Sequence, residues 1–156
     1  MTVPPGRIEA IFIAADRGAP MQSVAEARAV AGRGLVGDRY YANAGSLSRW
    51  AGPKRELTLI STEALEELNR QGVPLTAADS RRNVLVSGIE LNALVKQRIR
   101  LGEIDVKGVR LCQPCKYLER KTGITVLPAM IGRGGLRVQI LSDGLIRVGD
   151  PVDVLG

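Results

Sequence analysis

Cys112 and Cys115 carry the most reactive side chains of this sequence, and they stand in the motif RLCQPCK between Arg110 and Lys116. The motif follows a predicted strand and precedes a short helix predicted over residues 116–122. Cys115 would then lie at a helix N-terminus, where the helix dipole and the two flanking cations favour the thiolate. Such a thiolate is a nucleophile, a persulfide carrier or a soft metal ligand.

Other interpretations of the two cysteines remain open. Both can be small buried apolar residues, although the basic neighbours and Pro114 favour a reactive Cys115. The Cys-x-x-Cys spacing also fits a dithiol oxidoreductase or half of a zinc site. Zinc is disfavoured because the sequence has no histidine and no third cysteine, so carboxylates or a second subunit would have to complete the ligands.

Positive charge is concentrated around these thiols. Residues 81–137 hold twelve basic and four acidic side chains, a net charge of +8, whereas residues 1–80 hold nine of each. A patch of this kind attracts anions. Because histidine is absent, Ser-His-Asp and Cys-His mechanisms are excluded, and cations must stabilise any thiolate.

Two arginine motifs in this segment are candidates for holding the anion. Arg81, Arg82 and Asn83 stand where a polar stretch enters an apolar strand, and guanidinium groups bind phosphate or carboxylate at two points. Arg133 is followed by Gly134 and Gly135, which allow the backbone to approach a ligand or to adopt a positive φ. Both motifs are weak alone, because surface charge explains adjacent arginines equally well.

A fourth candidate is the glycine-framed turn of residues 34–40, which carries Asp38 and Arg39. An acid and a base in one turn can serve a ligand or a reaction. The alternative, a tight turn locked by a hydrogen bond from the backbone to Asp38, is equally well supported by the sequence.

Most of the chain predicts short strands. They are expected over residues 7–14, 56–60, 83–87, 98–101, 104–109, 136–141, 145–148 and 152–155, with turns at glycines between them. One helix is predicted from Ser61 or Thr62 to Arg70. Residues 21–31 have a helical composition that the glycines after them oppose, and residues 42–55 predict a loop around Trp50. The pattern is that of a mainly β barrel or sandwich with a few short α-helices.

The length and composition indicate one domain over residues 1–156. With 45% hydrophobic residues, 156 residues can bury one substantial core. Apolar runs are far shorter than the roughly 18 residues that span a bilayer, and no signal peptide is visible. We therefore expect a cytoplasmic protein without membrane association, in which both thiols stay reduced.

Several segments together resemble the MOSC family, named for the C-terminal domain of molybdenum cofactor sulfurases. They are GLVGDRYY (34–41), ELTLISTEAL (56–65), RRNVLVSGIELNALV (81–95), RLCQPCKYLE (110–119), RGGLRVQIL (133–141) and IRVGDPV (146–152). The resemblance follows the chain in order over nearly its whole length, and the small stand-alone bacterial members are the most similar type.

This resemblance implies a MOSC-type β-barrel and a role in binding molybdenum cofactor (molybdopterin) or delivering sulfur. It implies that Cys115 corresponds to the family's cysteine, with Arg82 and Asn83 in the motif beside it. Full sulfurases also have a pyridoxal-phosphate domain, and no pyridoxal-phosphate site is evident in this short chain. A stand-alone member must receive sulfur from elsewhere or use a preformed cofactor.

The leading hypothesis is that Cys115 binds or transfers sulfur, as a persulfide or as a direct molybdenum ligand. Arg81, Arg82 and Arg133 would hold the anionic groups of the ligand. The expected partner is an anionic pterin or a sulfur donor such as a cysteine desulfurase. The alternatives are a non-catalytic molybdopterin-binding module and a dithiol oxidoreductase. Nucleic acid is an unlikely partner because the aromatic content of 3% leaves few stacking platforms.

Overall fold

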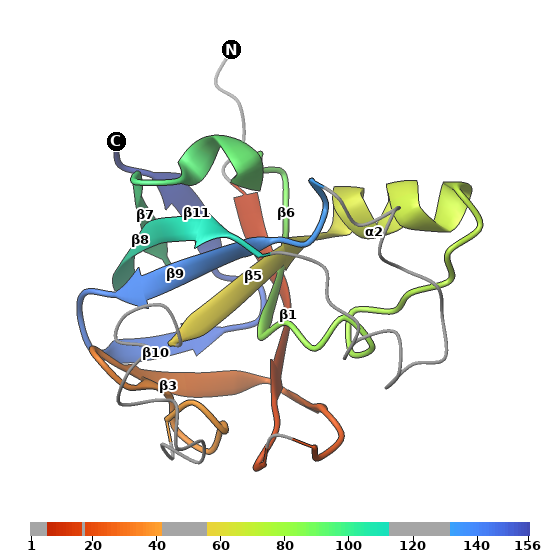
Figure 1. Cartoon of the computed structure of the whole chain (residues 1–156). Coiled ribbons are helices and arrows are strands. Elements are labelled where there is room, and N and C mark those ends of the chain that lie inside the picture. Colours follow the sequence, from red (N-terminus) through yellow and green to blue (C-terminus); the bar gives the residue numbers. More distant parts are fainter. Residues whose placement is uncertain (1–5, 17, 42–55, 113–131) are drawn as a thin grey trace.

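The computed structural model describes residues 6–16, 18–41, 56–112 and 132–156. Its main sheet has the order β11-β7-β8-β9-β5-β6-β1-β2, and pairing of β11 with β1 closes all but β2 into a barrel (Figure 1). The mainly β, barrel-like fold expected from the sequence is confirmed. The strands are β1 (Gly6–Ile13), β2 (Gln22–Val24), β5 (Leu57–Ser61), β6 (Val84–Ser87), β7 (Arg98–Leu101), β8 (Ile104–Leu111), β9 (Leu136–Ile140) and β11 (Pro151–Val154).

A smaller antiparallel sheet of β10 (Gly144–Arg147), β3 (Glu26–Val30) and β4 (Gly34–Leu35) lies against one end of the barrel (Figure 1). Strands β2 and β3 occupy the segment whose composition is helical. Pairing with β10 and burial of Ala27 and Ala29 on alternate positions of β3 outweigh that composition, so tertiary context decides the outcome.

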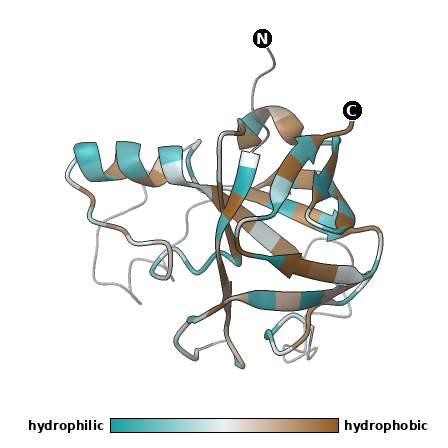
Figure 2. Ribbon diagram, turned by 180° about the vertical axis from the view of Figure 1, so that it is seen from behind, coloured by the Kyte–Doolittle hydropathy of each residue, from teal (hydrophilic) through white to brown (hydrophobic). Residues whose placement is uncertain are grey.

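The barrel interior is filled by aliphatic side chains from every strand of the closed ring. The alternating burial along β7 and β9 sends one set of residues inward and leaves charged residues outside. Figure 2 shows this distribution as hydrophobic positions interleaved with hydrophilic ones along the strands. The interior is therefore a packed core, and ligand chemistry must take place on the outside or at the ends.

Helix α2 (Thr62–Arg70) connects the parallel strands β5 and β6 and lies outside the barrel (Figure 1). It begins as the sequence predicts, because the Ser61 side chain accepts a hydrogen bond from the Ala64 backbone N–H at 3.1 Å. Leu65 and Leu68 form a second apolar cluster on the outer face of the sheet. This cluster fixes the strand ends from which the candidate site is built. A 3-10 turn, η2 (Leu91–Leu94), follows β6.

A buried carboxyl group joins the two sheets. Glu56 is only 3% exposed, and its Oε1 accepts hydrogen bonds from the backbone N–H groups of Gly32 at 3.1 Å and Ile140 at 3.0 Å. Burial raises the pKa of the Glu56 carboxyl above its usual value, while the two backbone hydrogen bonds act in the opposite direction. Glu56 thereby ties the turn after β3 to the end of β9.

Within the described residues, no helix has the length and apolar character needed to cross a membrane.

Candidate functional site

The candidate residues meet in a row that crosses the outer face of the barrel. Arg110 on β8 is opposite Arg137 on β9, and Arg137 is opposite Thr58 on β5. Backbone hydrogen bonds continue the row from Thr58 to Asn83 and from Asn83 to Phe12. The sequence neighbours of these residues point into the core, so the row itself faces outward. Segments far apart in the sequence thus meet in one row, in which Thr58 and Asn83 are themselves buried.

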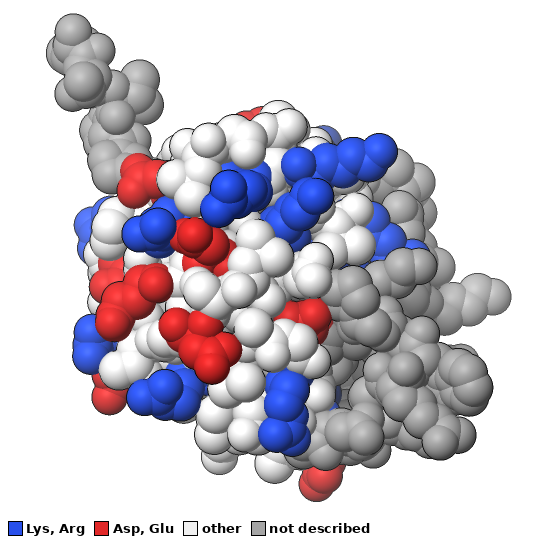
Figure 3. Space-filling model, turned by 90° about the vertical axis from the view of Figure 1, so that its left-hand side faces the viewer, with Lys and Arg blue, Asp and Glu red and all other residues white. Residues whose placement is uncertain are grey.

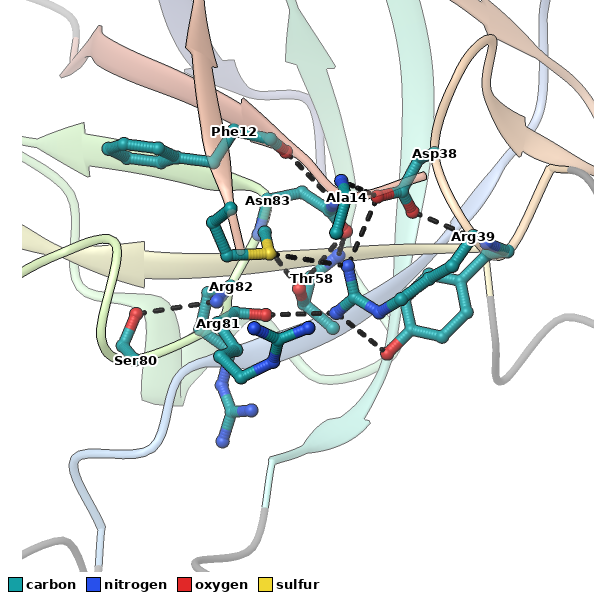
Figure 4. Close-up of polar contacts among 11 residues, drawn as sticks. Phe12, Ala14, Asp38, Arg39, Thr58, Ser80, Arg81, Arg82 and Asn83 are labelled. Atoms are coloured by element: carbon teal, nitrogen blue, oxygen red, sulfur yellow. Dashed lines mark hydrogen bonds and ion pairs between the residues drawn. The ribbon is translucent and has the colours of Figure 1, made fainter. Parts of the chain in front are cut away.

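Asn83 is the structural support of this row. It is fully buried, and its Oδ1 accepts hydrogen bonds from the Thr58 backbone N–H and hydroxyl group, both at 3.2 Å. Its Nδ2 donates to the Phe12 carbonyl at 3.1 Å (Figure 4). The side chain therefore joins three neighbouring strand segments, and a ligand would meet the residues that Asn83 positions.

Arg81 has an unusual backbone conformation at the entrance to β6. Its φ angle is +60°, a left-handed geometry that costs a non-glycine residue about 1–2 kcal/mol. The carbonyl of Arg81 accepts a hydrogen bond from Nη2 of the buried Arg39 at 3.1 Å (Figure 4). A strained residue held by a buried cation is typical of functional sites. This geometry turns the chain so that Arg82 points toward the loop before β9.

Asp38 holds Arg39 in place. The carboxylate is fully buried and accepts hydrogen bonds from the Ala14 backbone N–H at 2.9 Å and from Arg39 Nη1 at 3.1 Å. The Arg39 guanidinium also lies over the Tyr40 ring, 4.5 Å from its centroid. Asp38 also accepts a hydrogen bond from the Tyr40 backbone N–H at 3.4 Å, the kind of turn contact that the sequence offers as one alternative, and a role in a ligand site stays a prediction. Arg39 acts on the site through the backbone of Arg81.

Arg82 brings two further motifs into contact. Its Nε donates a hydrogen bond to the Gly134 carbonyl at 2.8 Å, and the Gly135 carbonyl accepts one from the Cys112 backbone N–H, also at 2.8 Å. A Cβ at position 134 would collide with the Cys112 carbonyl. Arg82, the pair Gly134–Gly135 and Cys112 therefore form one contact region, which we call the Arg82 junction. Cys112 belongs to the RLCQPCK segment of residues 110–116, which we call the thiol motif.

Gly135 is required by both its conformation and its surroundings. Its φ angle is +96°, and a Cβ would collide with the backbone carbonyl of Leu59. The glycine pair serves close packing of the loop on β5 and β8. Of the two roles that the sequence allows for the pair, Gly135 shows the positive φ, and the approach of a ligand to these glycines stays a prediction.

Arg133 faces a different environment from Arg82. It lines a surface pocket of about 510 Å³ together with Glu63 and Glu67 of α2 and with Asn92 of η2. Asn92 donates a hydrogen bond to the Gly132 carbonyl at 2.8 Å and so fixes the near end of the same loop. Among the described residues, neither Arg82 nor Cys112 lines this pocket.

Cys112 is 4% exposed, and Arg110, two positions earlier, is exposed on the outer face. Cys115 and Lys116 lie outside the described residues, as do the helix predicted over residues 116–122 and Trp50. Across the described ranges, no cluster of three or more histidine, cysteine, aspartate or glutamate residues could hold a metal ion. Any metal role predicted for Cys115 thus remains a prediction.

Sequence reasoning did not single out Thr58 and Tyr40. Thr58 is a buried polar residue whose hydroxyl group also accepts a hydrogen bond from the Asn83 backbone N–H at 3.0 Å. The alternation of the segment 56–60 contained the signal, because it places Thr58 on the face opposite the core. Tyr40 supports Arg39, and no pattern along the sequence indicated that contact.

These features define a class of protein: a closed β-barrel whose outer face joins arginines to a cysteine-bearing segment. A family model described as "MOSC domain" matches residues 47–153, and the chain belongs to the MOSC family. No curated protein matches the sequence.

Solved structures show the same fold. YuaD from Bacillus subtilis is similar with a TM-score of 0.78 and 19% identity, over 96% of this chain and 94% of that one. YiiM from Geobacillus stearothermophilus has a TM-score of 0.74 and 19% identity, over 97% and 76% of the two chains. YiiM from Escherichia coli has a TM-score of 0.69 and 19% identity, over 96% and 70%.

Proposed function

We propose that this protein binds an anionic, sulfur-bearing ligand at the Arg82 junction. The Cys115 thiolate would then carry sulfur as a persulfide or ligate molybdenum cofactor. The observation that carries the proposal is the hydrogen bond from Arg82 to Gly134 beside Cys112, which fixes a guanidinium group at the start of the thiol motif. Membership of the MOSC family gives this chemistry its context. A reducing cytoplasm would keep the thiol available.

The described residues fit a phosphate-bearing pterin in their chemistry. Arg82 and Arg110 present guanidinium groups, which bind phosphate at two points. Cys115 would supply the soft sulfur donor, the kind of ligand that a thiophilic metal centre accepts. When bound, molybdenum cofactor would provide that metal centre. The contribution of the chain itself is to hold the anion and to keep the thiol ionised through nearby positive charge.

As a sulfur carrier, Cys115 would react by thiol–persulfide exchange. The Cys115 thiolate attacks the terminal sulfur of a donor persulfide and forms a new S–S bond. The old S–S bond breaks, and its electron pair leaves with the donor's cysteine as a thiolate. The proton of the terminal sulfur stays with the transferred atom, so no external oxidant or reductant is consumed. A cysteine desulfurase is the donor class that presents such a persulfide.

Mass spectrometry after incubation with a cysteine desulfurase and cysteine tests the sulfur-carrier role. The expected result is one added sulfur atom on Cys115, lost in Cys115→Ser and retained in Cys112→Ser. Equal loss in both variants would instead indicate a dithiol oxidoreductase, which the burial of Cys112 does not favour. Normal uptake of sulfur and pterin by Cys115→Ser would refute the proposal.

The metal and pterin content of freshly purified protein distinguishes the two forms of the proposal. Molybdenum with a pterin chromophore, and no transfer of sulfur, identifies a non-catalytic cofactor-binding module. Persulfide without pterin identifies a sulfur carrier. Arg82→Ala should lower the bound pterin or the persulfide yield, whereas Arg28→Ala, an exposed arginine on β3, should leave both unchanged.

A further inference from the structure

Positive charge continues from the Arg82 junction across the outer face of β7, β8 and β9. Lys96, Arg98, Lys107 and Arg110 are exposed, and Arg137 is partly buried beside them. These five residues are termed the basic face. Figure 3 shows this side of the molecule, on which several Lys and Arg side chains lie close together near the top and others are interspersed with acidic side chains.

The register of the strands brings like charges together. Arg98 is directly opposite Lys107, and Arg110 is directly opposite Arg137. Like charges at directly opposite positions destabilise a β-sheet. Asp105 compensates part of this charge through its ion pair with Arg98 at 3.6 Å, and an external anionic partner would stabilise the cluster further.

The basic face leads to the thiol motif. Arg110 is near the end of β8, two positions before Cys112. The backbone N–H of Cys112 is held by a hydrogen bond to the Gly135 carbonyl. A macromolecule seated on β7, β8 and β9 would therefore lie next to Cys112, which is three positions before Cys115 in the sequence. This continuity connects the charged surface with the proposed chemistry.

The composition of the surface favours a protein over a nucleic acid. Asp105 is on the same face and forms ion pairs with Arg98 at 3.6 Å and with Arg100, and Asp153 on β11 is opposite Arg100. These carboxylates interrupt the positive charge and would repel a continuous phosphate backbone. The three strands contain no Phe, Tyr or Trp that could stack on bases. A mosaic of both signs matches the discrete charges of a protein surface.

We infer that the basic face docks a protein with an acidic surface, over the thiol motif. The inference rests on the proposed function only in naming what the docked protein does, which is to exchange sulfur with Cys115. Electrostatic attraction brings the partner into register, and the charge pairs Arg98–Lys107 and Arg110–Arg137 are its contact points.

Poly-L-glutamate, used as a defined acidic polypeptide, tests the surface directly. Chemical-shift changes of backbone amides should be concentrated in residues 96–110 and around Arg137. The double variant Arg98→Glu, Lys107→Glu should bind the probe about tenfold more weakly, the scale of electrostatic steering. The matched control Arg7→Glu, Arg28→Glu changes the same charge at exposed residues elsewhere and should keep the wild-type affinity for the probe.

Three results would overturn the inference. In the first, the double variant Arg98→Glu, Lys107→Glu, called the face variant, binds the probe as tightly as the wild type. In the second, the control variant loses as much affinity as the face variant. In the third, duplex DNA shifts the same amides at a lower concentration than poly-L-glutamate. The last result would identify a nucleic-acid surface. Cys115→Ser should still bind the probe, so failure of the proposed thiol chemistry leaves this measurement decisive.

Sulfur uptake tests the assigned role of the docked protein. The face variant should take up sulfur from a cysteine desulfurase about tenfold more slowly, whereas uptake from sodium polysulfide, a small anion that needs no docking surface, should slow much less. Equal slowing with both donors, or slowing with neither, would contradict the docking role. Absence of uptake from either donor in the wild type would refute the proposed function instead.

Discussion

Replacing Glu56 by alanine and by glutamine separates the hydrogen bonds of this side chain from its charge. In the alanine variant, the backbone N–H groups of Gly32 and Ile140 lose their acceptor inside the protein. A buried donor left unsatisfied costs about 1–3 kcal/mol, so two of them lower the free energy of unfolding by about 2–6 kcal/mol. This is a large part of the 5–15 kcal/mol that is typical of a domain.

Glutamine keeps the acceptor oxygen and removes the ionisable group. Because burial raises the pKa of Glu56 in the folded state, the folded protein holds this proton more strongly than the unfolded chain does. The stabilising contribution of the group is therefore complete below the unfolded-state pKa and declines as the pH rises through the folded-state pKa. Glu56→Gln should lack this decline, so its stability relative to the wild type should increase from acidic to neutral pH.

Urea unfolding followed by far-UV circular dichroism at several pH values measures both effects. Glu66→Gln, the same change at an exposed position of α2, is the control and should follow the wild type. The reasoning is refuted if Glu56→Ala unfolds at the same urea concentration as the wild type. It is also refuted if Glu56→Gln loses as much stability as Glu56→Ala.

Two further predictions concern the supports of the site. Asn83→Ala should lower the free energy of unfolding by about 2–4 kcal/mol, because it removes hydrogen bonds worth about 1 kcal/mol each and leaves their buried partner groups without a hydrogen bond. An unchanged midpoint of thermal unfolding would contradict this. Gly135→Ala should lose more stability than Gly149→Ala, measured by urea unfolding, since both glycines have φ +96° but only at Gly135 would the added Cβ collide with backbone. The control should lose about 1 kcal/mol from backbone strain alone, and equal losses would argue against the collision.

The sequence predicted the strands well because their signal is local. Alternation along segments such as 98–101 and 136–141, with glycine turns between them, needs no knowledge of the rest of the chain. The helix after Ser61 was predicted from its cap for the same reason. Residues 21–31 resisted prediction because pairing of β3 with β10, a strand more than one hundred residues later, determines their conformation.

The candidate site was predictable in its parts and not in its assembly. The arginines, the glycine pair and Cys112 could be named from composition and spacing. The contact between Arg82 and Gly134 spans 52 positions of the sequence, and no local pattern reports it. The pocket that Arg133 shares with Glu63 and Glu67 was equally hidden, because its lining residues come from distant segments of the sequence.

The ring of strands is closed by its first and last members. Strand β1 pairs with β11 through Gly6 with Val152 and Arg7 with Pro151, so the final seam joins residues separated by nearly the entire sequence. During synthesis on the ribosome, the part of β1 that contains Gly6 and Arg7 lacks its partner on this edge until β11 has emerged, whereas Ile11 to Ile13 can already pair with β2. Contacts of such long range make folding slow, and an exposed strand edge invites pairing with other chains. Nascent chains that stall before β11 should therefore depend on chaperones to stay free of aggregation.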